Sequence, residues 1–448
     1  MSAYSAIAHA VAQSETISEI SIGKDAIAAA GALFVRHFDS KRAYLVADEN
    51  TWRAAGESLE AALISKGIAC TRYILPGTPK LKPTVSLGQQ IIDKLQADDA
   101  VPVAIGSGVI NDLVKFAAFE LGRPYFCVAT AASMDGYASA GSPLSDAGFK
   151  KTIQCRPARV ILADLNVMCH APKAMTGWGY GDLAGKVPAG ADWIVADALG
   201  IEAVDDVAWP MVQNRLREWL GAPNEIQQGR PAAIAGLFEG LTLVGLAMER
   251  HGSSRPASGA DHQIAHLWEM EDLQLDGEPV SHGACVAIGC VAVLDLYAWL
   301  LEQDLAQIDV DYLVTHAASM RDKQQLIEQA FGDGEIARRS LAETAAKHVT
   351  PERLHKRLKL LQHVWPNLRE RLKAQLLPPS TAREMLEDVG APFHSQSIGI
   401  DHQRLQQSVA NARFLRSRYT VLDLLDETGL LAAAISAGIA QRPEPALK

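Results

Sequence analysis

The sequence predicts an α/β domain with a parallel, Rossmann-like sheet, followed by an all-α domain. Apolar, β-leaning runs alternate with helix-like segments over the first 165 residues. From about Asn166 onward, Ala, Leu, Glu, Gln and Arg replace the β-branched runs, which favours helices. Strands that alternate with helices indicate parallel pairing through right-handed crossovers. We therefore expect an α/β domain over residues 1–165 and a helical domain over residues 166–448.

The predicted strands are short apolar runs: Ile17–Ile22 at an edge, then Ala43–Ala47, Cys70–Leu75, Val101–Ile105, Tyr125–Ala129 and Val160–Ala163. The predicted helices of the first domain are Asp25–His37, Trp52–Lys66, Leu87–Gln96 and Ile110–Leu121, and those of the second include Gly236–Arg250, Pro351–Trp365 and His402–Arg418. Two such domains leave a cleft between them, where a ligand site is expected.

Composition indicates a globular protein that does not bind nucleic acid. The chain of 448 residues is too long for one small core, and 48% of it is hydrophobic. The formal net charge of −10 argues against nucleic-acid binding, which requires a basic surface. It does not argue against a small anionic substrate.

Three further observations predict a cytoplasmic protein. The six cysteines form no CxxC pair, which fits a reducing compartment. No basic residue precedes Lys24, so the start differs from a signal peptide. The apolar run Ala284–Leu301 contains Asp295 and is predicted to be a buried core helix, not a membrane span.

Histidines mark one candidate site. His262 and His266 are four residues apart and would leave the same face of a helix, and His282 follows shortly after. Neutral imidazole is a good ligand for zinc, nickel and iron. A helix surface that carries two histidines without a metal is the alternative interpretation.

A glycine-rich loop follows the predicted strand Val101–Ile105. Gly106 and Gly108 lead from the strand into a helix that carries Asn111 and Asp112 near its start. Glycine allows a ligand to approach the backbone, and a helix N-terminus offers N–H groups to a phosphate. A tight strand–helix turn without a ligand explains the loop equally well.

Two more polar segments directly follow predicted strands. Asp48 follows the run Ala43–Ala47 and is either a contact to a nucleotide ribose or a helix N-cap. The run Thr130–Ser139, TAASMDGYAS, is dense in small polar residues and contains Ser133 and Asp135. At the carboxyl end of a parallel strand such a run is expected to contact ligands.

Asp182 lies in the glycine-rich run GWGYGDLAGK. Taken alone it is a cap or turn residue. Together with His262 and His282 it becomes a candidate oxygen ligand. Three protein ligands with open positions are typical of catalytic metals.

These motifs together resemble the sn-glycerol-1-phosphate dehydrogenases, in the superfamily of iron-containing alcohol dehydrogenases and dehydroquinate synthase. The resemblance is carried by GSGVINDLVK, TAASMDGYAS, GWGYGDLAGK, SGADHQIAH and SHG, in this order from about Asp48 to His282. The segment RYTVLDLL from Arg418 is similar to the bacterial branch. This chain has Asp261 where relatives commonly have Glu, and Ser107 where many have a third glycine.

The resemblance implies a dehydroquinate synthase-like fold, a homodimer and a set of functional residues. A divalent metal, zinc, nickel or iron, would be bound by Asp182, His262 and His282. NAD(H) or NADP(H) would be contacted by Asp48 at its adenosine side, by Gly106, Gly108, Asn111 and Asp112 at its pyrophosphate, and by Thr130, Ser133 and Ser139. The substrate would be contacted by Asp135, Asp182 and His266, the last two also being catalytic.

The resemblance further implies reversible reduction of dihydroxyacetone phosphate to sn-glycerol 1-phosphate, with the metal acting on the carbonyl. Lys150, Lys151, Lys186 and Arg255 lie near the motifs as donors for the phosphate, and the sequence singles out none of them. Three alternatives stay open: a glycerol or polyol dehydrogenase of the same fold, a lyase like dehydroquinate synthase, and a binding protein without activity.

Overall fold

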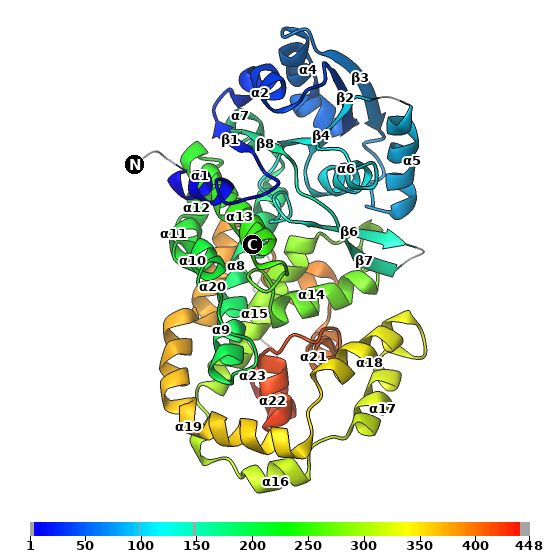
Figure 1. Ribbon diagram of the computed structural model, residues 1–448. Helices are drawn as coiled ribbons and strands as arrows, with labels where there is room; N and C mark the ends of the chain where they lie inside the picture. The colour runs from blue at the N-terminus through cyan, green and yellow to red at the C-terminus, as the bar shows by residue number, and fades with distance from the viewer. Residues whose placement is uncertain (1–3, 98, 147–148, 440–448) are drawn as a thin grey trace.

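The computed structural model describes residues 4–97, 99–146 and 149–439. A six-stranded sheet lies at one end of the molecule and helices form the other end (Figure 1). All neighbouring strands pair in parallel, so the predicted Rossmann-like sheet is confirmed. Across the sheet the strands are β1 (Glu19–Gly23), β8 (Val160–Asp164), β5 (Phe126–Ala129), β4 (Val101–Gly106), β2 (Arg42–Asp48) and β3 (Ala69–Leu75).

Alternating side chains bury both faces of this sheet. Leu45, Val103 and Phe126 are in register on neighbouring strands and pack into one core cluster. The next residue of each strand faces the opposite side, because successive side chains alternate. Helices α2 (Ala30–His37) and α4 (Glu57–Ile64) cover the first face, and α5 (Val85–Gln96) and α6 (Gly108–Glu120) cover the other.

A two-stranded hairpin follows the polar run Thr130–Ser139, and the sequence did not predict it. Strands β6 (Gly141–Asp146) and β7 (Phe149–Gln154) pair in antiparallel fashion. Their sequences lack the apolar run that marks the other strands, so periodicity gave no signal. The buried ammonium of Lys115 anchors the start of the hairpin by donating to the carbonyls of Gly136 and Gly141, at 2.8 and 2.9 Å.

Between β8 and residue 439, the end of the described chain, the regular structure is helical except for a two-stranded hairpin of β9 (Gln274–Leu275) and β10 (Glu278–Pro279). Its helices of eight or more residues are α8 (Lys173–Ala184), α9 (Lys186–Ala198), α13 (Pro231–His251), α14 (Ala260–Met270), α15 (His282–Leu300), α17 (Met320–Phe331), α18 (Glu335–Lys347), α19 (Pro351–Gln375), α20 (Pro379–Val389), α21 (His402–Ala412) and α23 (Leu431–Gly438). The shorter ones are α7 (Leu165–Met168), α10 (Ala208–Gln213), α11 (Leu216–Leu220), α12 (Pro223–Gln227), α16 (Val310–Thr315) and α22 (Val421–Glu427), while α1 (Ser5–Val11) and α3 (Glu49–Thr51) belong to the first part.

One predicted helix of this part is longer than the helix in the structure. The helix expected over His402–Arg418 ends at Ala412. Beyond it, the carbonyls of Arg418 and Tyr419 accept hydrogen bonds from the side chains of Gln263 and Arg255, so tertiary contacts hold this segment. The domain boundary near residue 165 stays a prediction.

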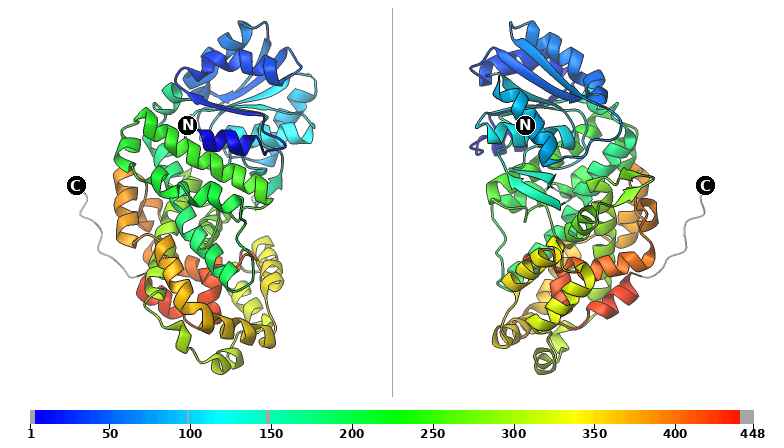
Figure 2. Two further views of the ribbon diagram at one scale, coloured as in Figure 1. Left: turned by 60° about the vertical axis from the view of Figure 1, so that its left-hand side comes forward. Right: turned by 90° about the vertical axis from the view of Figure 1, so that its right-hand side faces the viewer.

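Helices α13 and α15 are long and apolar enough to cross a membrane by length and composition alone. Within the fold, 72% and 89% of their most apolar windows are buried. In the left-hand view of Figure 2, the blue helix α1 near the N-terminus lies against the green helix α13. The predicted buried helix over Ala284–Leu301 therefore corresponds to α15, at the centre of the helical core.

Close glycine contacts bring α8 to the sheet domain and to α15. A Cβ at Gly179 would lie 1.9 Å from the carbonyl oxygen of Ala132. A Cβ at Gly283 would lie 2.1 Å from the carbonyl oxygen of Trp178. Helical glycine costs about 1 kcal/mol relative to alanine. The glycines of GWGYGDLAGK thus permit helix packing, which places Asp182 between the sheet domain and α15.

Candidate metal and active site

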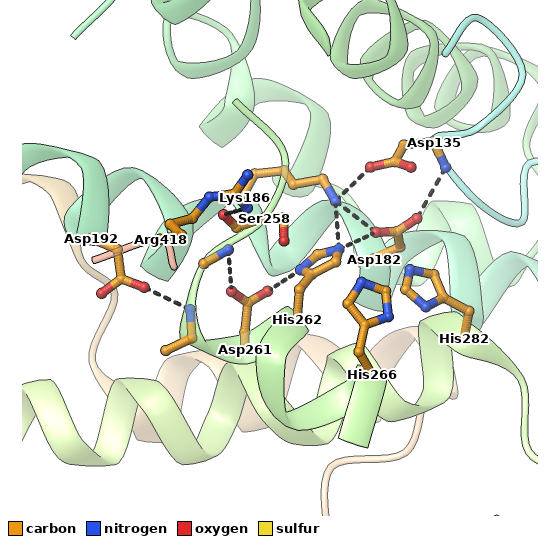
Figure 3. A network of polar contacts seen from close by, with 12 residues as sticks. Asp135, Asp182, Lys186, Asp192, Ser258, Asp261, His262, His266, His282 and Arg418 are labelled. Carbon is orange, nitrogen blue, oxygen red and sulfur yellow. Dashed lines mark hydrogen bonds and ion pairs between the residues drawn. The ribbon is translucent and has the colours of Figure 1, made fainter. Parts of the chain in front are cut away.

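Three histidines converge at the junction of the sheet domain and the helical part. His262 and His266 lie one turn apart on α14, and His282 is the first residue of α15. The ring of His262 is 6.0 Å from that of His266 and 5.4 Å from that of His282, between centroids. The three side chains face a common space (Figure 3). The predicted alignment of His262 and His266 on one helix face is confirmed.

Asp182 reaches the same space from α8. It lies inside this helix and is fully buried, so its interpretation as a cap or turn residue is wrong. The neighbouring glycines, which suggested a turn, serve close packing instead. One oxygen of Asp182, Oδ1, lies 3.5 Å from Nε2 of His262.

The residues present fit a divalent metal. One ligand atom from each of Asp182, His262 and His282 can be chosen so that all lie within 4.8 Å of one another. Tetrahedral zinc with bonds of about 2.0–2.2 Å holds its donor atoms about 3.3–3.6 Å apart, so the three side chains are near enough to close on one ion by local adjustment. One carboxylate and two imidazoles suit zinc, iron or nickel.

Outer carboxylates orient the imidazoles. Oδ2 of Asp261 lies 2.6 Å from Nδ1 of His262. Both oxygens of Glu269 are used: Oε2 lies 2.8 Å from Nδ1 of His266, and Oε1 lies 2.9 Å from Nδ1 of His282. Glu269 was not predicted from the sequence, although its place one turn after His266 on a helix was an available signal.

A buried lysine joins two carboxylates beside the histidines. The ammonium of Lys186 lies 2.6 Å from Oδ1 of Asp182 and 2.7 Å from Oδ2 of Asp135. The backbone N–H of Asp135 donates to Oδ2 of Asp182 at 3.0 Å. Asp135, from the polar run after β5, is thereby fixed against the carboxylate of the candidate metal site.

The charges of this cluster depend on one another. Burial opposes ionisation of Asp182, but Lys186 and the histidines outweigh it and hold the pKa of Asp182 well below its usual value. Burial also opposes a charge on His262, yet Asp261 and Asp182 raise its pKa to about 9. Burial dominates at His266 and lowers its pKa to about 3, so this ring is neutral at pH 7.

Among the candidate phosphate donors whose side chains the structure describes, only Lys186 lies in this cluster. Arg255 is fully buried and donates to the carbonyls of Asp192 and Tyr419, so it is a structural residue. Lys151 pairs with Asp146 on the β6–β7 hairpin. The side chain of Lys150 lies outside the described residues.

The glycine loop forms a strand–helix turn, as predicted. Gly106 ends β4 and Gly108 begins α6, whose first turn leaves backbone N–H groups unpaired. The backbone of Thr130 lies alongside, because its N–H donates to the carbonyl of Gly106 at 3.1 Å. This arrangement fits the pyrophosphate of a dinucleotide.

The polar side chains of Asn111 and Asp112 on α6 point inward. Oδ1 of Asn111 accepts from the Tyr125 hydroxyl at 3.0 Å, and Asp112 lies 3.3 Å from the buried Lys115 ammonium. Ser133 and Ser139 are nearly buried in the run after β5, and Ser139 donates to the carbonyl of Gly136. The part of this segment that faces a cofactor is therefore largely backbone.

Asp48 is an N-cap. Its carboxylate accepts from the N–H groups of Asn50 and Thr51, both at 2.8 Å, within a capping box at the start of α3. This confirms the capping interpretation. The carboxyl ends of parallel strands share one edge of a sheet, so Asp48 lies on the same edge as the glycine loop.

Comparisons with known proteins agree with this architecture. Residues 21–172 match the family model described as iron-containing alcohol dehydrogenase. A probable glycerol dehydrogenase from Sinorhizobium meliloti has a similar fold, with a TM-score of 0.60 over 95% of this chain and 98% of that chain, at 14% identity. The fold is thus that of the iron-containing alcohol dehydrogenases.

Closer relatives are similar along nearly the whole sequence. The glycerol-1-phosphate dehydrogenase (NAD(P)+) of Bacillus subtilis is 36% identical over 422 residues, which cover 93% of this chain and 92% of the relative. The protein of the same name from Geobacillus thermodenitrificans is 30% identical and covers 89% of this chain and 90% of its own. The chain belongs to the glycerol-1-phosphate dehydrogenase family.

Proposed function

We propose that this protein is a metal-dependent oxidoreductase that reduces dihydroxyacetone phosphate to sn-glycerol 1-phosphate, reversibly, with NADH or NADPH. The observation that carries the proposal is the convergence of Asp182, His262 and His282 from three helices, with ligand atoms within 4.8 Å of one another. The family membership supports the same substrate and cofactor.

Asp182, His262 and His282 would hold the metal, whose chemistry when bound is that of a Lewis acid on the substrate carbonyl. The nicotinamide cofactor supplies the hydride. The backbone of Gly106, Gly108 and the first turn of α6 binds the pyrophosphate, with Thr130, Ser133 and Ser139 beside it and Asp48 towards the adenosine. Asn111 and Asp112 act from inside by fixing this turn.

His266 and Asp135 orient the substrate. Because Nδ1 of His266 is engaged by Glu269, its Nε2 accepts the hydrogen of the substrate hydroxyl. In the direction of alcohol oxidation this nitrogen holds the departing proton, and in reduction it returns it. Asp135 is held by Lys186 and by its own N–H to Asp182, so its carboxylate stays at the substrate.

An assay of purified protein tests the proposal. After chelator treatment, zinc, nickel or iron is added back, and NADH or NADPH oxidation is followed with dihydroxyacetone phosphate and, in parallel, with dihydroxyacetone. We expect metal-dependent turnover that favours the phosphate, with the sn-1 enantiomer as product. Equal or faster turnover of dihydroxyacetone would indicate a polyol dehydrogenase, and turnover that survives complete metal removal would contradict the role of the metal.

We also propose a cytoplasmic homodimer without a membrane-spanning segment. All six cysteines, each within the described residues, are free thiols, which supports a reducing compartment. Light scattering of the purified protein tests the dimer, and a monomeric mass would contradict it.

A further inference from the structure

One carboxylate serves two histidines in this site. Glu269 lies on α14, one turn after His266, and its side chain is 7% exposed. Oε2 contacts Nδ1 of His266 at 2.8 Å and Oε1 contacts Nδ1 of His282 at 2.9 Å. The two rings stack at 5.6 Å between centroids with an interplanar angle of 20°. Glu269 thus joins α14 to the first residue of α15.

This arrangement determines which nitrogen of each ring carries the proton. An ionised carboxylate only accepts hydrogen bonds, so both Nδ1 atoms must donate. In a neutral imidazole the other nitrogen, Nε2, is then left with its lone pair. For His282 that lone pair is the one available to a metal, and for His266 it is the one available to a hydroxyl.

We propose that Glu269 is a positioning residue that holds His266 and His282 in the same tautomer through a single carboxylate. Metal binding by His282 and substrate contact by His266 are thereby coupled. The proposal rests on the proposed function for the roles of these two histidines. His262 is held in the same way by a separate carboxylate, Asp261, and does not depend on Glu269.

Replacing Glu269 with glutamine tests its hydrogen bonds to the two histidines separately from its packing. Glutamine has nearly the shape of glutamate but offers one acceptor oxygen and one donor NH₂ group. It can accept from only one of the two Nδ1–H groups through its oxygen, and its NH₂ group faces the other ring. That ring must move its proton to Nε2 or lose the hydrogen bond.

The experiment compares wild type with Glu269→Gln in three measurements: ring ¹⁵N signals of the metal-free histidines, metal affinity by chelator competition, and KM and kcat with dihydroxyacetone phosphate at saturating metal. In wild type we expect both rings to carry their proton on Nδ1. In Glu269→Gln we expect one ring to carry it on Nε2. Metal affinity should fall by roughly 10-fold, within the 10–100-fold range typical of such outer partners, and KM should rise at saturating metal.

Glu271→Gln is the matched control. Glu271 lies at the end of the same helix, is 36% exposed and pairs with Arg404 at 2.8 Å. The same chemical change there should leave all three measurements as in wild type.

Two results would overturn the proposal. One is a wild-type spectrum in which either ring carries its proton on Nε2, a measurement that does not depend on any variant folding. The other is a folded Glu269→Gln protein whose metal affinity and KM both stay within about two-fold of wild type, well short of the expected effect. If wild type neither binds metal nor reduces the substrate, the proposed function is contradicted. The ring ¹⁵N signals of the metal-free protein still test the role of Glu269 independently.

Discussion

Lys186 is a fully buried ammonium between two carboxylates, and its contacts distinguish it from an ordinary surface lysine. Its pairs with Asp182 and Asp135 measure 2.6 and 2.7 Å. Burial alone would lower the pKa of Lys186, but the two carboxylates outweigh it and raise the pKa above its usual value. The charge is therefore part of the folded state at any physiological pH.

Replacing this residue, Lys186→Met, should destabilise the metal-free protein by about 3–5 kcal/mol. Two carboxylates would be left close together and buried without their cation. Removing one partner of a buried ion pair is strongly destabilising because the remaining charge is uncompensated. Urea unfolding in the presence of a chelator measures the effect. Lys173→Met, at the exposed start of the helix that carries Asp182, is the control and should change stability little. A loss below about 1 kcal/mol for Lys186→Met would contradict the argument, since that is the value of an exposed pair.

At the scale of elements, the site depends on how closely α8 approaches its neighbours. The backbone of Gly179 lies against the carbonyl of Ala132, and Gly181 lies against Ala287 of α15, where a Cβ would be 2.7 Å from the Cβ of Ala287. Asp182 is the residue after Gly181, so any displacement of α8 directly moves this proposed metal ligand.

Gly179→Ala should therefore lower both stability and metal affinity. The new Cβ would meet a backbone oxygen at 1.9 Å, and overpacking of this kind typically costs about 1–3 kcal/mol. Thermal unfolding and chelator competition measure the two effects. Gly236→Ala on α13, where a Cβ meets nothing within 4 Å, should instead leave metal affinity unchanged and stabilise by up to about 1 kcal/mol. Wild-type metal affinity in Gly179→Ala would show that α8 adjusts without moving Asp182.

For the whole molecule, the candidate metal site connects parts that are distant in sequence. Asp182, His262 and His282 come from α8, α14 and α15, and Asp135 adds a contact from the sheet domain. These groups are together only in the folded chain. A metal bound by them must therefore stabilise the entire helical part.

Zinc at about 100 times its dissociation constant should raise the free energy of unfolding by about 2.7 kcal/mol. Urea unfolding of the chelator-treated protein, with and without zinc, measures the gain. His262→Ala removes one ligand and should abolish most of it. If zinc raised the free energy of unfolding equally in wild type and in this variant, zinc would be binding elsewhere. The assignment of the three ligands would then be wrong.

The sequence by itself determined the sheet strands, the helical second part and the identity of the proposed metal ligands. Apolar periodicity is a local property that reveals strands and helices, whereas Asp182, His262 and His282 were nominated through motifs that resemble those of a known family. The polar β6–β7 hairpin was missed because its strands lack an apolar run.

Only the tertiary structure decided the remaining points. It placed Asp182 inside a helix. The glycines of GWGYGDLAGK permit close contacts between elements, and no local sequence pattern records such contacts. The structure assigned Lys186 to the site and Arg255 to the core, and it brought one oxygen of Glu269 to each of two histidines. The physical reason is that such contacts join residues distant in the chain, so their partners are fixed by packing and not by spacing.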